Sequence, residues 1–280
     1  MNKIDVIALF FSSFIFIIHI NASTDSLCVG HRGYTLGGHP ENTLISLEKA
    51  ISAGADGLES DVRLTKDGEV IMIHDDSFNR TTNGTGLVID HDWNGYIEYL
   101  KTKDGTANIP RFQDVLNLLK KQENKNIFLI RNNPIQIIDK MAEIFYKSNS
   151  DYDFGNQIFL GVWTYEFYLR TKKLIPKLPI SYIGDDISIA RENYFDYIES
   201  YNMEYPQVLL DHTKFTKTLC EKGRKMFVWT VNEDGDLKSV MNYGHSEGYG
   251  VYGILSDDVV KCIRNPTVIR AVEARSAEHA

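Results

Sequence analysis

Three short apolar runs near the beginning of the chain each end in residues that can carry chemistry. The polar groups that follow them are His31-Arg32-Gly33, Glu59-Ser60-Asp61 and His74-Asp75. Between the first two groups, residues 43–53 place apolar side chains at helical spacing. A strand, a helix and a second strand predict a parallel pair, and parallel strands present functional residues at their carboxyl ends. The three runs therefore predict strands that point polar groups the same way.

This set of side chains suits the cleavage of a phosphodiester. The imidazoles of His31 and His74 can accept a proton from an attacking oxygen and give one to a leaving oxygen. Arg32 can bind phosphate oxygens through its planar guanidinium. Glu59 and Asp61, two residues apart on a strand, point to one face and offer oxygen ligands for Mg²⁺ or Ca²⁺. Such a cation would neutralise charge on the phosphoryl oxygens.

Six motifs follow one another along the chain: His31-Arg32-Gly33, Pro40-Glu41-Asn42-Thr43, Glu59-Ser60-Asp61, His74-Asp75, Trp229-Thr230-Val231-Asn232 and Ser256-Asp257. In type and order they resemble the motifs of the glycerophosphodiester phosphodiesterase family. The resemblance covers about residues 29–257. It implies a (β/α)₈ TIM barrel of the phospholipase C-like phosphodiesterase type, a divalent metal, and two histidines that act as acid and base.

Strings in the middle of the chain indicate a narrower likeness. Residues 157–163 and 178–184, together with Ala190-Arg191, resemble the fungal branch of the family that acts as a phospholipase C on phosphatidylglycerol. These strings are of a packing type and carry no catalytic residue.

The chain departs from the family at the fourth predicted strand, where relatives carry an acid as the third metal ligand. The corresponding stretch, 126–134, contains no acid. Either Arg131 occupies the ligand position and places its charge against the two carboxylates, or one residue has been lost and the strand faces shift. Asn132, Asn133 and Asp211 are candidate replacement ligands. We expect a divalent ion to bind, more weakly than in relatives with three acids.

Apolar runs continue to alternate with helical stretches along the rest of the chain, which argues for an α/β fold with a parallel sheet. Further candidate strands are 127–131, 158–163, 180–184, 208–211, 226–232 and 251–256, and helical stretches include 111–122 and 135–146. With the first three, this makes nine candidates for an eight-stranded barrel, of which 208–211 is the least secure. A chain of 280 residues is long enough for one barrel and little else.

The segment 76–109 is long, polar and follows the third apolar run on the catalytic side. We expect it to form a rim around the substrate mouth. Its apolar members are expected to pack as a local core; exposed, they would suit a membrane surface. They are Trp93, Tyr96, Ile97 and Leu100.

Two further residues each have a structural interpretation. Asn42 precedes the helix that begins near Thr43, so it is the predicted N-cap of that helix. Trp229 is interpreted either as a cap on the barrel core or as an apolar wall over the glycerol or lipid part of the substrate.

Residues 1–22 predict entry into the secretory pathway. Lys3 precedes an apolar run over 6–20, and Asn21-Ala22-Ser23 supplies small residues near a cleavage point. This is the pattern of a signal peptide, with an uncleaved signal anchor as the alternative. The predicted organisation is a leader at 1–22, a barrel at 23–265 and a C-terminal tail at 266–280. We expect a secreted or extracellular protein, or a signal-anchored membrane form.

The cysteines and the net charge limit the remaining possibilities. Cys28, Cys220 and Cys262 allow at most one disulfide and leave a free thiol, and Cys28 is expected to face the barrel interior. A net charge of −8 argues against nucleic acid as a partner and leaves no polybasic membrane anchor. The expected partner is a small-molecule or lipid phosphodiester, with peripheral membrane contact compatible with a lipid substrate.

The sequence therefore predicts a phosphoric diester hydrolase that acts on glycerophosphodiesters or on phosphatidylglycerol-type lipids. The predicted site consists of the catalytic His31 and His74, the substrate-binding Arg32 and Trp229, and the metal ligands Glu59 and Asp61. The alternative is a catalytically impaired barrel that binds lipid or glycerophosphodiester without turnover, which the missing acid favours. The oligomeric state stays open.

Overall fold

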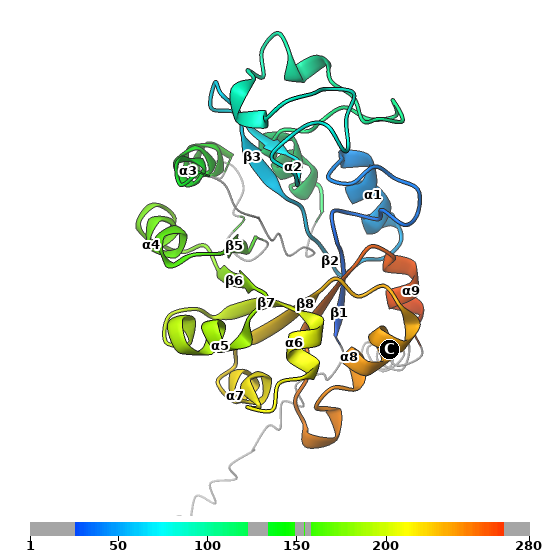
Figure 1. Cartoon of the computed structure of the whole chain (residues 1–280), viewed down its shortest axis with the longest axis vertical. Coiled ribbons are helices and arrows are strands. Elements are labelled where there is room, and N and C mark those ends of the chain that lie inside the picture. The colour runs from blue at the N-terminus through cyan, green and yellow to red at the C-terminus, as the bar shows by residue number, and fades with distance from the viewer. Residues whose placement is uncertain (1–25, 123–133, 149–153, 155–157, 266–280) are drawn as a thin grey trace, which may run out of the picture.

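The computed structural model describes residues 26–122, 134–148, 154 and 158–265. A seven-stranded parallel sheet forms its centre, in the order β2-β1-β9-β8-β7-β6-β5 (Figure 1). The strands are β1 (Leu27–Gly30), β2 (Gly57–Leu58), β5 (Leu160–Val162), β6 (Ile180–Gly184), β7 (Ser200–Glu204), β8 (Lys225–Trp229) and β9 (Gly253–Ser256). The sheet is curled, so the predicted α/β barrel fold is confirmed.

Helices surround the curled sheet on its outer side (Figure 1). They are α1 (Leu44–Ser52), α2 (Phe112–Leu119), α3 (Gln136–Ser148), α4 (Tyr165–Leu174), α5 (Ile187–Ile189), α6 (Tyr205–Leu209), α7 (Phe215–Glu221), α8 (Asp234–Asn242) and α9 (Val259–Arg264). A π-helical turn, η3 (Ala190–Tyr194), follows α5, and short 3₁₀ turns are η1 (Val88–Asp90), η2 (Ile97–Tyr99) and η4 (His245–Glu247). The main apolar core lies between helices and sheet. A smaller cluster of Val29, Phe159, Phe227 and Leu255 fills the inside of the curl.

The third apolar run does not join the parallel sheet. β3 (Val62–Leu64) and β4 (Val70–Met72) pair with each other as a separate antiparallel hairpin. The third apolar run is a strand, as predicted, but it lies outside the parallel sheet, because the turn at 65–68 reverses the chain and a parallel pair needs a long crossover. The Ile73 amide donates to the Asp61 carbonyl at 3.0 Å, so the hairpin still brings His74 beside the end of β2.

A second correction concerns the run at 208–211, which is not a strand. Its first part belongs to α6, which has a proline in its first turn. The strand is β7 at Ser200–Glu204, whose alternation includes inward polar side chains such as Asn202 and therefore carries a weak apolar signal. The candidate strand 127–131, the leader 1–22 and the tail 266–280 lie outside the described residues.

The rim segment 76–109 forms a local core, as predicted. Seven buried side chains make up this cluster: Ile71, Ile73, Phe78, Val88, Ile97, Leu100 and Ile109. Trp93 and Tyr96 pack against it, partly buried. Within the described residues, no helix combines the length and the apolar character that a membrane crossing needs.

A disulfide joins the first strand to the last described helix. Cys28 on β1 bonds to Cys262 on α9, with 5.9 Å between their Cα atoms, and Cys220 stays free. The prediction that Cys28 faces the barrel interior is wrong. Alternation along β1 points Val29 inward, so Cys28 points outward to the helix layer, where α9 follows β9 and packs on β1.

Removal of this disulfide should lower stability. The bond closes a loop with a sequence separation of 234 residues, so the unfolded chain is strongly restricted while it is intact. We expect Cys28→Ala/Cys262→Ala to lower the free energy of unfolding by about 2–5 kcal/mol in denaturant titrations. Cys220→Ala is the matched control and should change little. An unchanged double variant would show that the bridge contributes nothing to stability.

Candidate active site

The loop after β1 has an unusual backbone that several contacts hold in place. Arg32 has a φ of 57°, in the left-handed region that non-glycine residues rarely adopt. Its amide donates to Glu59 Oε2 at 3.0 Å, and its carbonyl accepts from the Asn42 amide at 3.0 Å. The next residue must be glycine, because a Cβ on Gly33 would lie 2.3 Å from the Ser46 hydroxyl oxygen on α1. The close approach of this loop to α1 thus sets the direction of Arg32.

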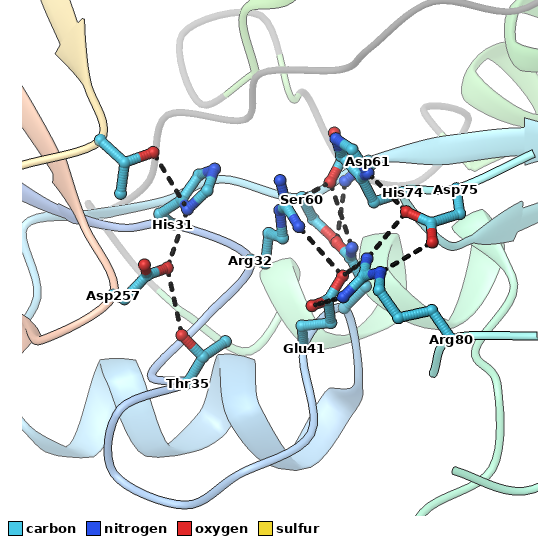
Figure 2. Close-up of polar contacts among 12 residues, drawn as sticks. His31, Arg32, Thr35, Glu41, Ser60, Asp61, His74, Asp75, Arg80 and Asp257 are labelled. Carbon is cyan, nitrogen blue, oxygen red and sulfur yellow. Dashed lines mark hydrogen bonds and ion pairs between the residues drawn. The ribbon is translucent and has the colours of Figure 1, made fainter. Parts of the chain in front are cut away.

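His31 is oriented by a carboxylate from the opposite end of the chain. Its Nδ1 lies 2.8 Å from Asp257 Oδ1, directly after β9 (Figure 2). Asp257 also accepts from the Thr35 hydroxyl at 3.1 Å and from Asn232 Nδ2 at 2.7 Å. Burial works to raise the pKa of Asp257, but the His31 contact and these hydrogen bonds outweigh it and lower the pKa. The opposite ring nitrogen, Nε2, lies 3.9 Å from Glu59 Oε2.

Two buried carboxylates follow β2. Glu59 is 6% exposed and Asp61 is 2% exposed. Burial and the charge of Asp61 raise the pKa of Glu59 to about 7, although His31 and Arg32 oppose this shift. A pair of buried acids that repel each other in this way is the kind of group that a divalent cation stabilises.

Asn42 orients the second of these carboxylates. Its Nδ2 donates to Asp61 Oδ2 at 3.1 Å, while its Oδ1 accepts from the Asp61 amide at 2.9 Å and from the Ser60 hydroxyl at 2.6 Å. The prediction that Asn42 caps α1 is therefore wrong. Thr43 is the N-cap, since its hydroxyl oxygen accepts from the Ser46 amide.

A chain of ion pairs connects the second histidine to Arg32. His74 Nδ1 lies 2.8 Å from Asp75 Oδ1, and Arg80 binds both oxygens of Asp75 at 2.7 and 2.8 Å. Arg80 also binds both oxygens of Glu41, each at 2.7 Å, and Glu41 in turn accepts from Arg32 Nη1 at 3.1 Å. In the view of Figure 2, Arg32 lies between His31 and His74. One guanidinium thus fixes the carboxylates that hold both a histidine and an arginine.

Most of the predicted site residues line one cavity at the carboxyl end of the sheet. Its lining consists of His31, Arg32, Glu59, Asp61, Ile183, Asn202, Trp229, Thr230 and Leu255. Trp229 packs on the cluster inside the curl and also lines the cavity, so its contact with a substrate stays a prediction. His74 is not among the lining residues and joins the site through the ion pairs above.

Glu59 and Asp61 are the described residues that fit a divalent cation, because both are buried carboxylates in the cavity. Within the described ranges, no group of three or more His, Cys, Asp or Glu side chains could hold a metal. Asp211 does not supply the missing acid, because its carboxylate accepts from the Thr213 and Phe215 amides at the start of α7. Arg131, Asn132 and Asn133 lie outside the described residues.

Three residues that support the site, Asp257, Arg80 and Asn232, have no individual role that the sequence predicted. Asp257 belongs to a recognised motif, but only the fold brings it to a histidine 226 residues away. Arg80 lies five residues after Asp75. In neither a helix nor a strand does this spacing place two side chains in contact, so the sequence does not indicate the ion pair. Asn232 Oδ1 accepts from the Asp257 amide at 2.9 Å, so it completes the support of His31.

The fold and the cavity define an α/β barrel with a phosphodiesterase type of site. Residues 31–261 match the Glycerophosphoryl diester phosphodiesterase family. The chain belongs to this enzyme family, whose members hydrolyse glycerophosphodiesters and typically use a divalent metal.

Similar proteins span nearly the same length. A glycerophosphodiester phosphodiesterase of Caldanaerobacter subterraneus is 28% identical over 247 residues, which cover 83% of this chain and 94% of the relative. That of Bacillus altitudinis is 28% identical over 242 residues, or 82% of this chain and 95% of the relative. A phosphodiesterase of Oleispira antarctica, solved in complex with the product sn-glycerol-3-phosphate, has a TM-score of 0.70 at 18% identity and covers 90% of this chain and 99% of its own. The last comparison shows the shared fold.

Loss of the Arg80 side chain should weaken catalysis more than stability. We expect Arg80→Gln to lower kcat/KM roughly 10- to 100-fold, because His74 and Arg32 lose a common support and small displacements of reacting groups are costly. The melting temperature should change little, since the Arg80 side chain is 48% exposed. Arg170→Gln on α4, which breaks an ion pair with Asp139, is the control. Equal activity losses in both variants would contradict a specific role for Arg80.

The raised pKa of Glu59 predicts a pH dependence of stability in metal-free protein. Between the ordinary carboxyl pKa of 4.5 and about 7, the folded protein binds more protons than the unfolded chain. The free energy of unfolding should therefore fall as pH rises through this window, by at most about 1.4 kcal/mol per pH unit. Glu59→Gln should flatten this slope in denaturant titrations, and an unchanged slope would assign the effect to another group.

The stabilisation by a bound metal should show the opposite pH dependence and increase as pH rises. Mg²⁺ binds the deprotonated carboxylate, so the rise in melting temperature on adding Mg²⁺ should be larger at pH 8 than at pH 5.5. Glu59→Gln should abolish most of the rise at pH 8. A rise independent of pH and of Glu59 would place the metal elsewhere.

Proposed function

We propose that this chain hydrolyses glycerophosphodiesters in the cavity at the end of β1 and β2, with His31 and His74 as the acid and base pair. The observation that carries the proposal is the hydrogen bond between His31 and Asp257, which points Nε2 toward Glu59 in a cavity that also contains Arg32. A histidine oriented through Nδ1 by a carboxylate is suited to exchange a proton at Nε2.

The reaction exchanges one phosphorus–oxygen bond for another. An attacking hydroxyl oxygen, from water or from the substrate's own glycerol, forms a bond to phosphorus, and the bond from phosphorus to the leaving alcohol breaks. One histidine accepts the proton of the attacking hydroxyl, and the other gives a proton to the leaving oxygen. Asp257 and Asp75 stabilise the positive charge of whichever imidazole holds the proton.

Arg32 would bind the negatively charged phosphoryl oxygens. Asp61, Glu41 and Glu59 surround its guanidinium, and although burial works to lower the pKa of Arg32, these carboxylates raise it. The side chain therefore stays cationic at any pH at which the enzyme is used. Glu59 and Asp61 would hold a divalent metal, which when bound supplies positive charge to the phosphoryl group.

The substrate class is supported by the similar proteins. The Oleispira antarctica phosphodiesterase binds sn-glycerol-3-phosphate as its product, which is the fragment expected from a glycerophosphodiester. We keep phosphatidylglycerol as the second substrate to test, because residues 157–163 and 178–184 resemble the fungal phospholipase C branch. Trp229 provides an apolar wall for the carbon skeleton in either case.

We also propose that the protein works in the secretory pathway or outside the cell. The support is twofold: the apolar leader pattern at 6–20, and the buried disulfide between Cys28 and Cys262, a bond that persists in oxidising compartments.

Replacement of either histidine should abolish hydrolysis without unfolding the protein. We expect His31→Ala and His74→Ala each to lower kcat on glycerophosphocholine by roughly 10²–10⁴-fold. His245→Ala is the control, since this histidine lies in η4 and is not among the cavity residues. Full activity in either test variant would contradict the assignment of that histidine.

The dependence on metal decides the role of Glu59 and Asp61. Glycerophosphocholine and phosphatidylglycerol should each be assayed with Mg²⁺, with Ca²⁺ and with a chelator. We expect turnover to be lost in the chelator and restored by a divalent ion. Turnover that survives the chelator would indicate that a cationic side chain acts in place of the metal. Absence of turnover in every condition, from folded protein, would favour a barrel that binds the substrate without cleaving it.

A further inference from the structure

One polar side chain in the cavity lacks a hydrogen-bond partner that its burial demands. Asn202 on β7 is 3% exposed and lines the cavity together with His31, Arg32 and Trp229. Its side-chain oxygen, Oδ1, is buried and accepts no hydrogen bond from the described residues. Buried amide oxygens in proteins are nearly always paired, so an unpaired one on a cavity wall indicates that a ligand supplies the donor.

The strand register places Asn202 deeper than Trp229. In the parallel pair of β7 and β8, Asn202 lies opposite Phe227, whereas Glu204 lies opposite Trp229. Side chains alternate along a strand, so Asn202 occupies the layer directly below the indole, on the same inner face of the sheet. The Trp229 indole nitrogen donates to the Asn202 carbonyl at 3.1 Å, which fixes the two residues relative to each other.

The surroundings of Asn202 make its amide the polar group of an otherwise apolar floor. Ile183 lies opposite Asn202 in the pair of β6 and β7, and it also lines the cavity. Leu255 and Phe227 belong to the buried cluster inside the curl. A substrate group that reaches this part of the cavity therefore contacts mainly apolar side chains and the amide of Asn202.

The chemistry of Oδ1 selects what can bind there. An amide oxygen only accepts hydrogen bonds, and so do the oxygens of an ionised phosphate, so a phosphoryl group cannot satisfy it. A hydroxyl group can donate to Oδ1. The cavity groups that would face the phosphoryl group, His31 and Arg32, lie instead directly after the carboxyl end of β1.

We propose that Asn202 is a specificity-determining residue that binds a hydroxyl group of the substrate's glycerol, beneath the indole of Trp229. The inference rests on the proposed function, which brings a glycerol phosphate into this cavity. With the phosphoryl group at Arg32, the glycerol carbons extend along Trp229 and a hydroxyl reaches Oδ1. Asn202 thus favours diesters with a free glycerol hydroxyl over diesters of simple alcohols.

Binding of two small phosphate monoesters tests this proposal independently of turnover. We would measure the dissociation constants of sn-glycerol-3-phosphate and methyl phosphate by calorimetry, since both carry the same phosphate and only the first carries glycerol hydroxyls. The wild-type protein should prefer sn-glycerol-3-phosphate. Asn202→Leu should weaken sn-glycerol-3-phosphate roughly 10- to 100-fold and leave methyl phosphate unchanged.

Ser181→Ala is the matched control. Ser181 lies on the neighbouring strand β6, is fully buried and also has an unpaired side-chain oxygen, but it does not line the cavity. Its replacement should change neither dissociation constant. If Asn202→Leu fails to fold by circular dichroism, Asn202→Ala provides the same comparison, and the preference for sn-glycerol-3-phosphate should again be lost.

The outcomes separate this inference from the proposed function. Wild-type protein that prefers sn-glycerol-3-phosphate through Asn202 but does not hydrolyse glycerophosphocholine would overturn the proposed function and support the role of Asn202. Wild-type protein that hydrolyses glycerophosphocholine while both Asn202 variants keep the preference would overturn the role of Asn202 alone. Equal weakening of both ligands in Asn202→Leu and Asn202→Ala would also overturn it, because the glycerol hydroxyl would not be the group recognised.

Discussion

The burial of two carboxylates, Glu59 and Asp61, is the constraint on which the rest of the site depends. Neighbouring negative charges that are removed from water repel each other. In this structure the guanidinium of Arg32, amide N–H donors and the imidazole of His31 lie around the two carboxylates. Arg32, whose backbone is left-handed beside Gly33, places its Nε 3.4 Å from Asp61 Oδ2. The loop after β1, held by its close approach to α1, thus places a positive charge beside the buried acids.

The same electrostatic requirement extends outward through the ion pairs to the rim. Glu41 binds the guanidinium groups of Arg32 and Arg80, and Asp75 binds Arg80 and His74. Each of these charged side chains therefore has a partner of opposite sign before substrate binds. Apolar packing beneath the rim anchors this network, because Ile73 belongs to the cluster of the 76–109 segment and directly precedes His74. The geometry of the candidate site and the local folding of the rim therefore depend on the same few residues.

The sequence predicted the fold class, and it singled out His31, Arg32, Glu59, Asp61 and Trp229, which the structure brings together in one cavity. These residues meet because parallel strands deliver their last residues to one edge of the sheet, whatever the helices between them do. The hairpin of β3 and β4, the strand at Ser200–Glu204 and the cap at Thr43 were missed. The hairpin forms because a tight turn reverses the chain. The strand at Ser200–Glu204 carries polar side chains that point into the barrel, so its apolar pattern is weak. Asn42 does not cap the helix because its side chain binds the carboxylate of Asp61.

The partnership of Cys28 with Cys262 has a topological meaning. The bond links positions near the two ends of the described fold, so nearly the whole barrel lies within one covalent ring. A single proteolytic cut at any place between these cysteines opens the ring but leaves both pieces joined in one molecule. Tyr99 in the rim is 73% exposed to solvent, so a protease could cut the backbone there. His31 and Asp257 would then still belong to one covalently linked molecule.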